Sequence, residues 1–147
     1  MSHEQQFREL LGSTQPINVE QLHALYDGLV PVDQAFMLGR WNGGVFNTGH
    51  PGEKQLGKLG WVGKTFHHTN DVDPMVCKQA DGSVAASPLM GKASLRVVEY
   101  RGVSTATMVY DNHPIFDHFK KVTDTLVLGV MDKKGDEFPL YFYLERA

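Results

Sequence analysis

The sequence predicts a mainly β protein, a single antiparallel β-barrel of about 8 to 10 strands preceded by two short N-terminal helices. Three observations lead to this fold class. Short apolar segments recur at intervals of about ten residues from residue 36 onward, as in barrels and sandwiches. The chain of 147 residues holds 15 glycines, which suit the many tight turns between such strands. The segment 140–144 is apolar or aromatic at every position, so both of its faces require cover.

Helical patterns occur only near the N-terminus. Residues 4–11 are expected to form one short helix that ends at Gly12. A second helix is expected after Asn18, with Asn18 as its cap and Gln21 as the capping-box partner. Its apolar side chains share one stripe, which we expect to pack across the mouth or the side of the barrel: Leu22, Leu25, Tyr26 and Leu29.

The remaining chain is interpreted as strands separated by polar turns. For residues 50–70 the pattern leaves the structure open, with a short helix over 55–60 and a strand over 61–67 as the preferred interpretation. The other expected strands are 36–46, 75–78, 83–86, 93–100, 103–110, 115–122, 125–131 and 140–146.

A closed barrel explains the apolar last strand better than an open sheet does. One face of that strand would line the interior, the helices would cover the other, and closure would remove exposed edges. We therefore expect one domain over 1–147, in which residues 1–30 pack on or cap a barrel formed by residues 31–147.

Composition narrows the classes of partner. The net charge of −3 provides no basic field for nucleic acid. No apolar run approaches the roughly 20 residues that a membrane-spanning helix needs. The single cysteine, Cys77, and the polar start of the chain favour a cytoplasmic protein. Composition leaves the oligomeric state open.

One short motif and a set of later motifs point to a known family. Residues 39–43 read Gly-Arg-Trp-Asn-Gly, which is GXWXG. The second half contains Leu95–Gly102, Thr107–Asp111, Pro114–Ile115, Phe119–Val122, Leu128–Asp132 and Leu144–Arg146 in that order. Together these resemble the GXWXG protein family with its C-terminal domain of unknown function, over residues 31–146. The resemblance brings no established activity.

The Gly-X-Trp element also resembles the first strand of lipocalins and of calycin-like barrels in general. That resemblance implies a lipocalin-like barrel with Trp41 at its closed end, packed under Arg146 from the last strand. A stacked guanidinium and indole would seal that end, so both residues are expected to be structural. The two leading helices and the lack of a secretory signal differ from lipocalins and argue against extracellular transport.

Candidate ligand-binding residues follow from one hairpin register. If Arg101 and Gly102 form a two-residue loop, Tyr100 pairs with Val103, and a four-residue connection through Pro114 then sets the next strand. Eight residues are predicted to line a cavity: Leu95, Val97, Ala106, Met108, Tyr110, Asp117, Phe119 and Lys121. A shift by one residue would turn Arg96 inward and Asp117 outward, and the sequence leaves this choice open. With Asp117 inside, either Tyr110 or Lys121 is expected to donate to it.

The expected function is binding of a small apolar or amphipathic molecule inside the barrel. One alternative is a filled barrel without a ligand. The other is an enzyme that uses Tyr110, Asp117, His118 or Lys121 as acid–base groups. No cofactor or metal is expected, because adjacent His67 and His68 point to opposite faces of a strand. A haem axial ligand cannot be chosen between His113 and His118, and the sequence contains no nucleophile or phosphate-binding motif.

Overall fold

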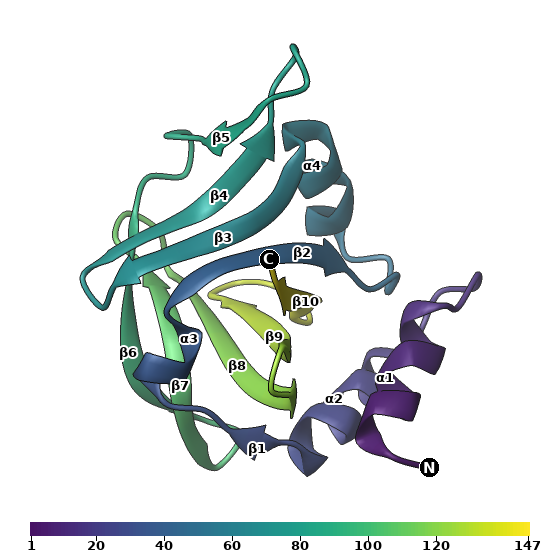
Figure 1. Cartoon of the computed structure of the whole chain (residues 1–147). Coiled ribbons are helices and arrows are strands. Elements are labelled where there is room, and N and C mark those ends of the chain that lie inside the picture. Colours follow the sequence, from purple (N-terminus) through teal and green to yellow (C-terminus); the bar gives the residue numbers. More distant parts are fainter.

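The computed structural model describes all residues from Met1 to Ala147, and its central feature is a closed antiparallel β-barrel (Figure 1). Around the barrel each strand pairs with the next, and β8 pairs with β9 to close the circle. In spatial order the eight barrel strands are β2 (Gly39–Val45), β3 (Trp61–His68), β4 (Asp71–Lys78), β6 (Ala93–Tyr100), β7 (Val103–Tyr110), β8 (Ile115–Thr123), β9 (Leu126–Lys133) and β10 (Leu140–Arg146). The short β1 (Val30–Pro31) adds to β8, and β5 (Val84–Ala86) adds to β4.

Helices α1 (His3–Leu11) and α2 (Val19–Gly28) pack against the outer side of the barrel (Figure 1). Their apolar stripes form one buried cluster with outward-facing side chains of β9 and β10, including Leu128 and Tyr141. The inward-facing Phe142 and Leu144 belong to the barrel interior instead. The last strand is therefore covered on both faces, which explains why all of its first five residues are apolar or aromatic. None of the helices is long and apolar enough to cross a membrane.

The helix caps differ in part from the sequence prediction. Asn18 does cap α2, and its side chain accepts a hydrogen bond from the Glu20 amide at 2.9 Å. Gln21 is not a capping-box partner, and its backbone amide donates instead to the Asn18 carbonyl. A capping box occurs at α1, where Ser2 and Gln5 exchange hydrogen bonds.

Two further helices flank the GXWXG strand. The short α3 (Gln34–Met37) is capped by Asp33 and occupies residues that were expected to begin the first long strand. Helix α4 (Pro51–Leu59) starts four residues earlier than the expected 55–60 helix. Proline suits the first turn of a helix, and Gly60 ends α4 at a left-handed φ of 70°.

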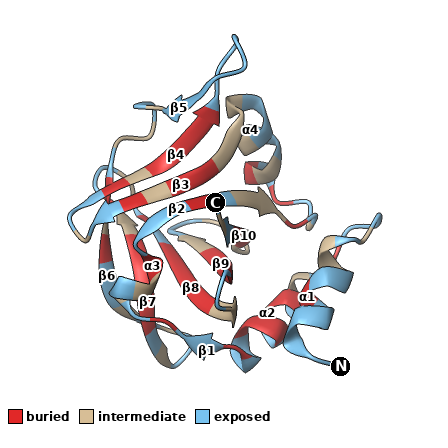
Figure 2. Cartoon of the chain, viewed as in Figure 1, coloured by how far each residue is buried: buried red, intermediate tan, exposed pale blue.

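The register of the central hairpins agrees with the sequence prediction. Tyr100 pairs with Val103, and Met108 lies opposite Asp117. Asp117 is buried and faces the interior, and much of β8 is buried (Figure 2). Val97 was predicted wrongly to line a cavity, because its side chain is 56% exposed. Strand β6 pairs with β4 only between Ala93 and Val72, so at Val97 it is paired with β7 alone and β4 does not cover it.

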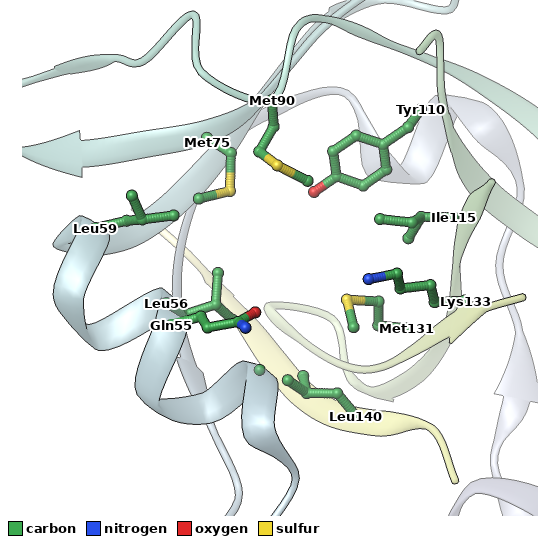
Figure 3. A pocket seen from close by; sticks show the side chains of 11 residues that line it. Gln55, Leu56, Leu59, Met75, Met90, Tyr110, Ile115, Met131, Lys133 and Leu140 are labelled. Carbon is green, nitrogen blue, oxygen red and sulfur yellow. The ribbon is translucent and has the colours of Figure 1, made fainter. Parts of the chain in front are cut away.

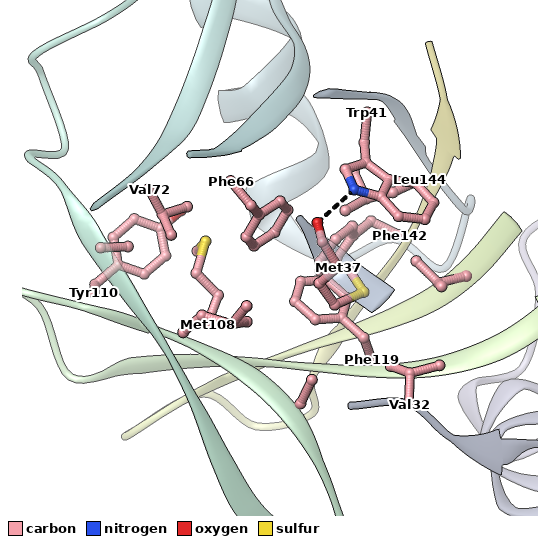
Figure 4. Close-up of a cluster of buried hydrophobic side chains, with 14 of the residues drawn as sticks. Val32, Met37, Trp41, Phe66, Val72, Met108, Tyr110, Phe119, Phe142 and Leu144 are labelled. Carbon is pink, nitrogen blue, oxygen red and sulfur yellow. Dashed lines mark hydrogen bonds between the residues drawn. The ribbon is translucent and has the colours of Figure 1, made fainter. Parts of the chain in front are cut away.

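One end of the barrel is sealed by Trp41 and Arg146, as the lipocalin resemblance implied. The Arg146 guanidinium lies 4.2 Å from the centre of the Trp41 ring. It also donates to the carbonyls of Leu38 and Phe36. The Trp41 indole donates to the Met37 carbonyl at 2.8 Å (Figure 4). This end holds the packed core, in which Phe119 meets Phe66 and Phe142 edge to face.

The glycines of the GXWXG strand and its neighbour permit this packing. Gly39 has a φ of 116°, which L side chains rarely adopt. A Cβ at Gly43 would lie 2.5 Å from the Trp61 ring. A Cβ at Gly63 would lie 2.1 Å from the Trp41 carbonyl oxygen. Gly43 thus leaves room for the Trp61 ring, and Gly63 lets β3 approach the backbone of β2 at Trp41.

Candidate ligand-binding site

The end of the barrel opposite Trp41 contains an apolar pocket beneath α4. Its volume is about 90 Å³. Leu56 and Leu59 of α4 form one wall, and Met75, Met90 and Met131 line much of the rest (Figure 3). The Tyr110 hydroxyl points into this space (Figure 3). Methionine is a flexible and polarisable lining, so the pocket can adapt its shape to a ligand.

A smaller pocket adjoins the first one on its inner side. It has a volume of about 20 Å³ and shares Leu56, Met75, Tyr110, Met131 and Leu140 with the outer pocket. Its remaining lining consists of Trp61, Lys64, Asp117 and Phe142. The combined space thus narrows from an apolar entrance to one charged pair.

That charged pair joins two strands that are not neighbours in the sheet. Nζ of Lys64 on β3 lies 3.1 Å from Oδ2 of Asp117 on β8, and both side chains are almost fully buried. The ammonium also donates to the Pro74 carbonyl at 3.2 Å. It lies 5.4 to 5.7 Å from the ring centres of Trp61, Tyr110 and Phe142. Such rings stabilise a cation through their negative faces.

Asp117 has one oxygen atom without a partner. Oδ2 accepts from Lys64, whereas Oδ1 is buried and makes no hydrogen bond within the chain. Burial raises the pKa of Asp117 and lowers the pKa of Lys64, and the opposite charge of each residue partly offsets the shift of the other. Burial also raises the pKa of Tyr110 well above its ordinary value. The site therefore contains a carboxylate with free acceptor capacity at the base of an apolar pocket.

The structure brings together only two of the eight predicted ligand-binding residues. Tyr110 and Asp117 line the pockets. Four others lie in the packed core toward the sealed end and line neither pocket: Leu95, Ala106, Met108 and Phe119. Val97 is exposed.

Lys121 does not donate to Asp117. It points toward the sealed end, where its Nζ lies over the Phe36 ring and pairs with Asp124. Lys64, and not Tyr110 or Lys121, is the donor to Asp117. The expectation that one of the latter two would hold Asp117 was therefore wrong. Lys121 lies four residues beyond Asp117 on β8, nearer the sealed end, so its ammonium does not reach the carboxylate.

His118 faces the outer side of the barrel and takes no part in the pockets. Its ring stacks on Tyr100 with centres 4.0 Å apart, and Nε2 lies 3.2 Å from Asp132 Oδ2. Of the four residues considered as acid–base groups, only Tyr110 and Asp117 therefore line the pockets. His67 pairs with Asp73 at 2.8 Å on the surface, apart from both pockets.

Sequence reasoning missed Lys64, Trp61 and the contribution of α4 to the pocket. Lys64 stands two residues before the apolar Phe66, a spacing that would place both on one face of a regular strand. The signal was weak because β3 contains register shifts between Trp61 and His68, which interrupt strict alternation. The contribution of α4 depends on where that helix packs, and its sequence does not specify this.

Comparisons with known proteins agree with the fold. The chain matches the family described as GXWXG protein over residues 24–82 and the domain of unknown function DUF4334 over residues 91–146. It is similar to a protein from Thermomonospora curvata of known crystal structure, with 40% sequence identity and a TM-score of 0.93. That similarity covers 100% of this chain and 99% of the other. No curated protein matches the chain.

Proposed function

Because the chain belongs to the GXWXG protein family and its barrel holds an apolar pocket that ends at a buried ion pair, we propose that it binds a small amphipathic molecule there. The apolar part of the ligand lies under α4 among the methionines. Its polar end reaches Lys64 and Asp117. Binding pockets commonly combine an apolar lining with a few placed polar groups that orient the ligand.

The buried ion pair is the observation that carries this proposal. Desolvating two charges often costs more than their attraction returns, so apolar residues of similar volume would serve stability as well or better. A pair built into a barrel core is therefore better explained by a ligand than by folding. The pair also lines the inner pocket, at the base of the apolar space, from which a bound molecule can be oriented.

The pocket volume limits the ligand. Its outer part of about 90 Å³ is smaller than an engineered cavity of about 150 Å³ that holds benzene. With α4 in place, this volume limits the ligand to about the size of benzene or of a short alkyl chain. A larger ligand requires α4 to move, and the N-terminal end of α4 is fixed by His50, whose Nε2 lies 2.9 Å from Asp136.

Methionine methyl groups provide a direct test. Three methionines line the outer pocket (Met75, Met90 and Met131), whereas Met1, Met37 and Met108 do not. Titration of protein carrying ¹³C-methyl methionine with benzene and with 1-hexanol should shift the first three resonances saturably. The other three should remain within the range of solvent effects.

A blocked variant separates pocket binding from surface binding. Leu56→Trp places a larger side chain in both pockets and should abolish the saturable shifts. Leu89→Trp, at a side chain that is 65% exposed, is the matched control and should bind as the natural chain does. Shifts that persist in Leu56→Trp, or no shift with either probe in the natural chain, would refute the proposal.

Acid–base catalysis in the same pocket is the second candidate. Lys64 and Asp117 lie within hydrogen-bonding distance, and Tyr110 lines the same space, which is the convergence an acid–base enzyme needs. Native mass spectrometry of freshly purified protein would identify a retained molecule. Incubating that molecule with catalytic amounts of protein distinguishes the two functions, since a binding protein returns it unchanged.

A further inference from the structure

We infer that the polar end of the ligand is a neutral hydroxyl group whose hydrogen is donated to Oδ1 of Asp117. This inference rests on the proposed function and specifies the chemical class of the ligand. Its starting point is the unpartnered Oδ1, which is buried at the inner pocket. A buried acceptor requires a donor, and no group of the chain supplies one, so the site has a place for a donor from a bound molecule.

Charge balance selects against ionised head groups. The inner pocket contains one ammonium and one carboxylate, so Lys64 and Asp117 neutralise each other. A ligand carboxylate would meet Asp117 without a second cation, and a ligand ammonium would meet Lys64 without a second anion. Either ligand would bury one unpaired charge, which is far more costly than burying a hydroxyl. The only other charged residue of the two pockets is Lys133, at the exposed rim of the outer one.

Size leads to the same class. The inner volume of about 20 Å³ exceeds the roughly 10–15 Å³ that one water molecule requires, but leaves no room for a second. It therefore accepts a head group with one oxygen atom. Carboxylate, sulfonate and phosphate groups carry two or more.

Tyr110 provides a second contact for the same hydroxyl. It lines both pockets, and because its pKa is raised its O–H remains protonated and can donate to the ligand oxygen. A hydroxyl group both donates and accepts, so it can meet Asp117 and Tyr110 together. An ether of the same shape can only accept.

Four isomeric or isosteric probes test this inference on the natural chain. The methionine methyl shifts give the affinity for 1-hexanol, 1-methoxypentane, hexanoate and hexylamine. We expect 1-hexanol to bind at least tenfold more tightly than the other three. Equal or tighter binding of the isomeric ether or of hexanoate would overturn the inference, whereas failure of benzene and 1-hexanol to bind at all would overturn the proposed function instead.

Variants locate the preference at Asp117. In Asp117→Asn the affinity for 1-hexanol should fall at least tenfold. The affinity for hexanoate should rise, because Lys64 loses its counterion. Asp132→Asn removes a carboxylate from the outer side of the barrel, beside His118, and should leave the four affinities unchanged. An unchanged hexanol preference in Asp117→Asn would overturn the inference. If that variant does not fold, the comparison of 1-hexanol with 1-methoxypentane on the natural chain still tests the inference.

Discussion

Nζ of Lys64 and Oδ2 of Asp117 lie 3.1 Å apart in the barrel interior, on strands β3 and β8, which do not pair with each other. The contact therefore spans the interior and does not reinforce a pair of adjacent strands. Each residue compensates the burial of the other, so their contributions to stability are strongly coupled.

Removing one member of this pair should destabilise the protein. Lys64→Met leaves a buried carboxylate without its cation and should lower the free energy of unfolding by about 3–5 kcal/mol. The double variant Lys64→Met/Asp117→Leu removes both charges and should recover most of the loss. Urea unfolding with a constant m-value measures the free energies of unfolding of the single and the double variant. A double variant as unstable as the single one would show that the pair itself holds the barrel together.

The pH dependence of Lys64→Met provides a check on the same coupling. Lys64 is the main group that lowers the pKa of Asp117, and burial raises it. Without Lys64, the folded protein should hold a proton on Asp117 well above the ordinary value of 3.8. The contribution of Asp117 to stability should therefore be greatest at low pH and be lost as pH rises through its folded pKa. The double variant lacks this carboxyl group and should not show that decline.

The stack of Arg146 on Trp41 should be structural. Arg146→Ala removes a cation–π contact and hydrogen bonds to two carbonyls, and should cost about 2–3 kcal/mol of stability. In a Trp61→Phe background the emission of Trp41 should shift to the red as water reaches its ring. Arg146→Lys keeps the charge but lacks the planar guanidinium, so its stability should lie between those of the natural chain and Arg146→Ala. Unchanged stability together with lost binding of 1-hexanol would contradict this role.

His118 should make the protein less stable in acid. Burial lowers the pKa of His118 from 6.5, although Asp132 opposes the shift. The unfolded chain therefore takes up a proton before the folded one does, and stability falls as pH drops below about 6.5. His23, whose pKa burial also lowers, contributes in the same direction.

His118→Asn should reduce this acid-induced loss, measured as urea midpoints between pH 7.5 and pH 5. His3→Gln, at an exposed position in α1, is the matched control. If the urea midpoint changes equally with pH in the natural chain, His118→Asn and His3→Gln, groups other than His118 cause the pH dependence.

Two glycines should respond in opposite ways to alanine. At Gly63 a Cβ would lie 2.1 Å from the Trp41 carbonyl oxygen, which is backbone and cannot move aside. Gly63→Ala should therefore destabilise by more than about 2 kcal/mol. At Gly57 in α4 no atom lies within 4 Å of the added Cβ, so alanine should stabilise the helix by up to about 1 kcal/mol. Thermal melting of both variants tests the prediction, and a stable Gly63→Ala would show that β2 and β3 can separate locally.

The sequence by itself determined the barrel and most of its strands, whereas the structure decided between the two registers and turned Asp117 inward. Alternation and turn chemistry act over a few residues, so the hairpin from Ala93 to Tyr110 could be placed to the residue, and its register followed from a two-residue loop. The sealed end was implied by the resemblance of the Gly-X-Trp element to lipocalins, in which an arginine of the last strand packs on this tryptophan.

Only the tertiary structure decided which inward-facing residues form a site. Inward direction is a property of one strand, whereas a pocket depends on which end of the barrel is filled and which is covered. Met108 and Tyr110 share one face of β7, yet the first is buried in the core and the second lines the pocket. Lys64 meets Asp117 from a distant part of the chain across strands that do not pair, and α4 covers the open end from a segment whose sequence left its structure open. Local patterns act along the chain, but the closure of a barrel brings together residues that no local pattern relates.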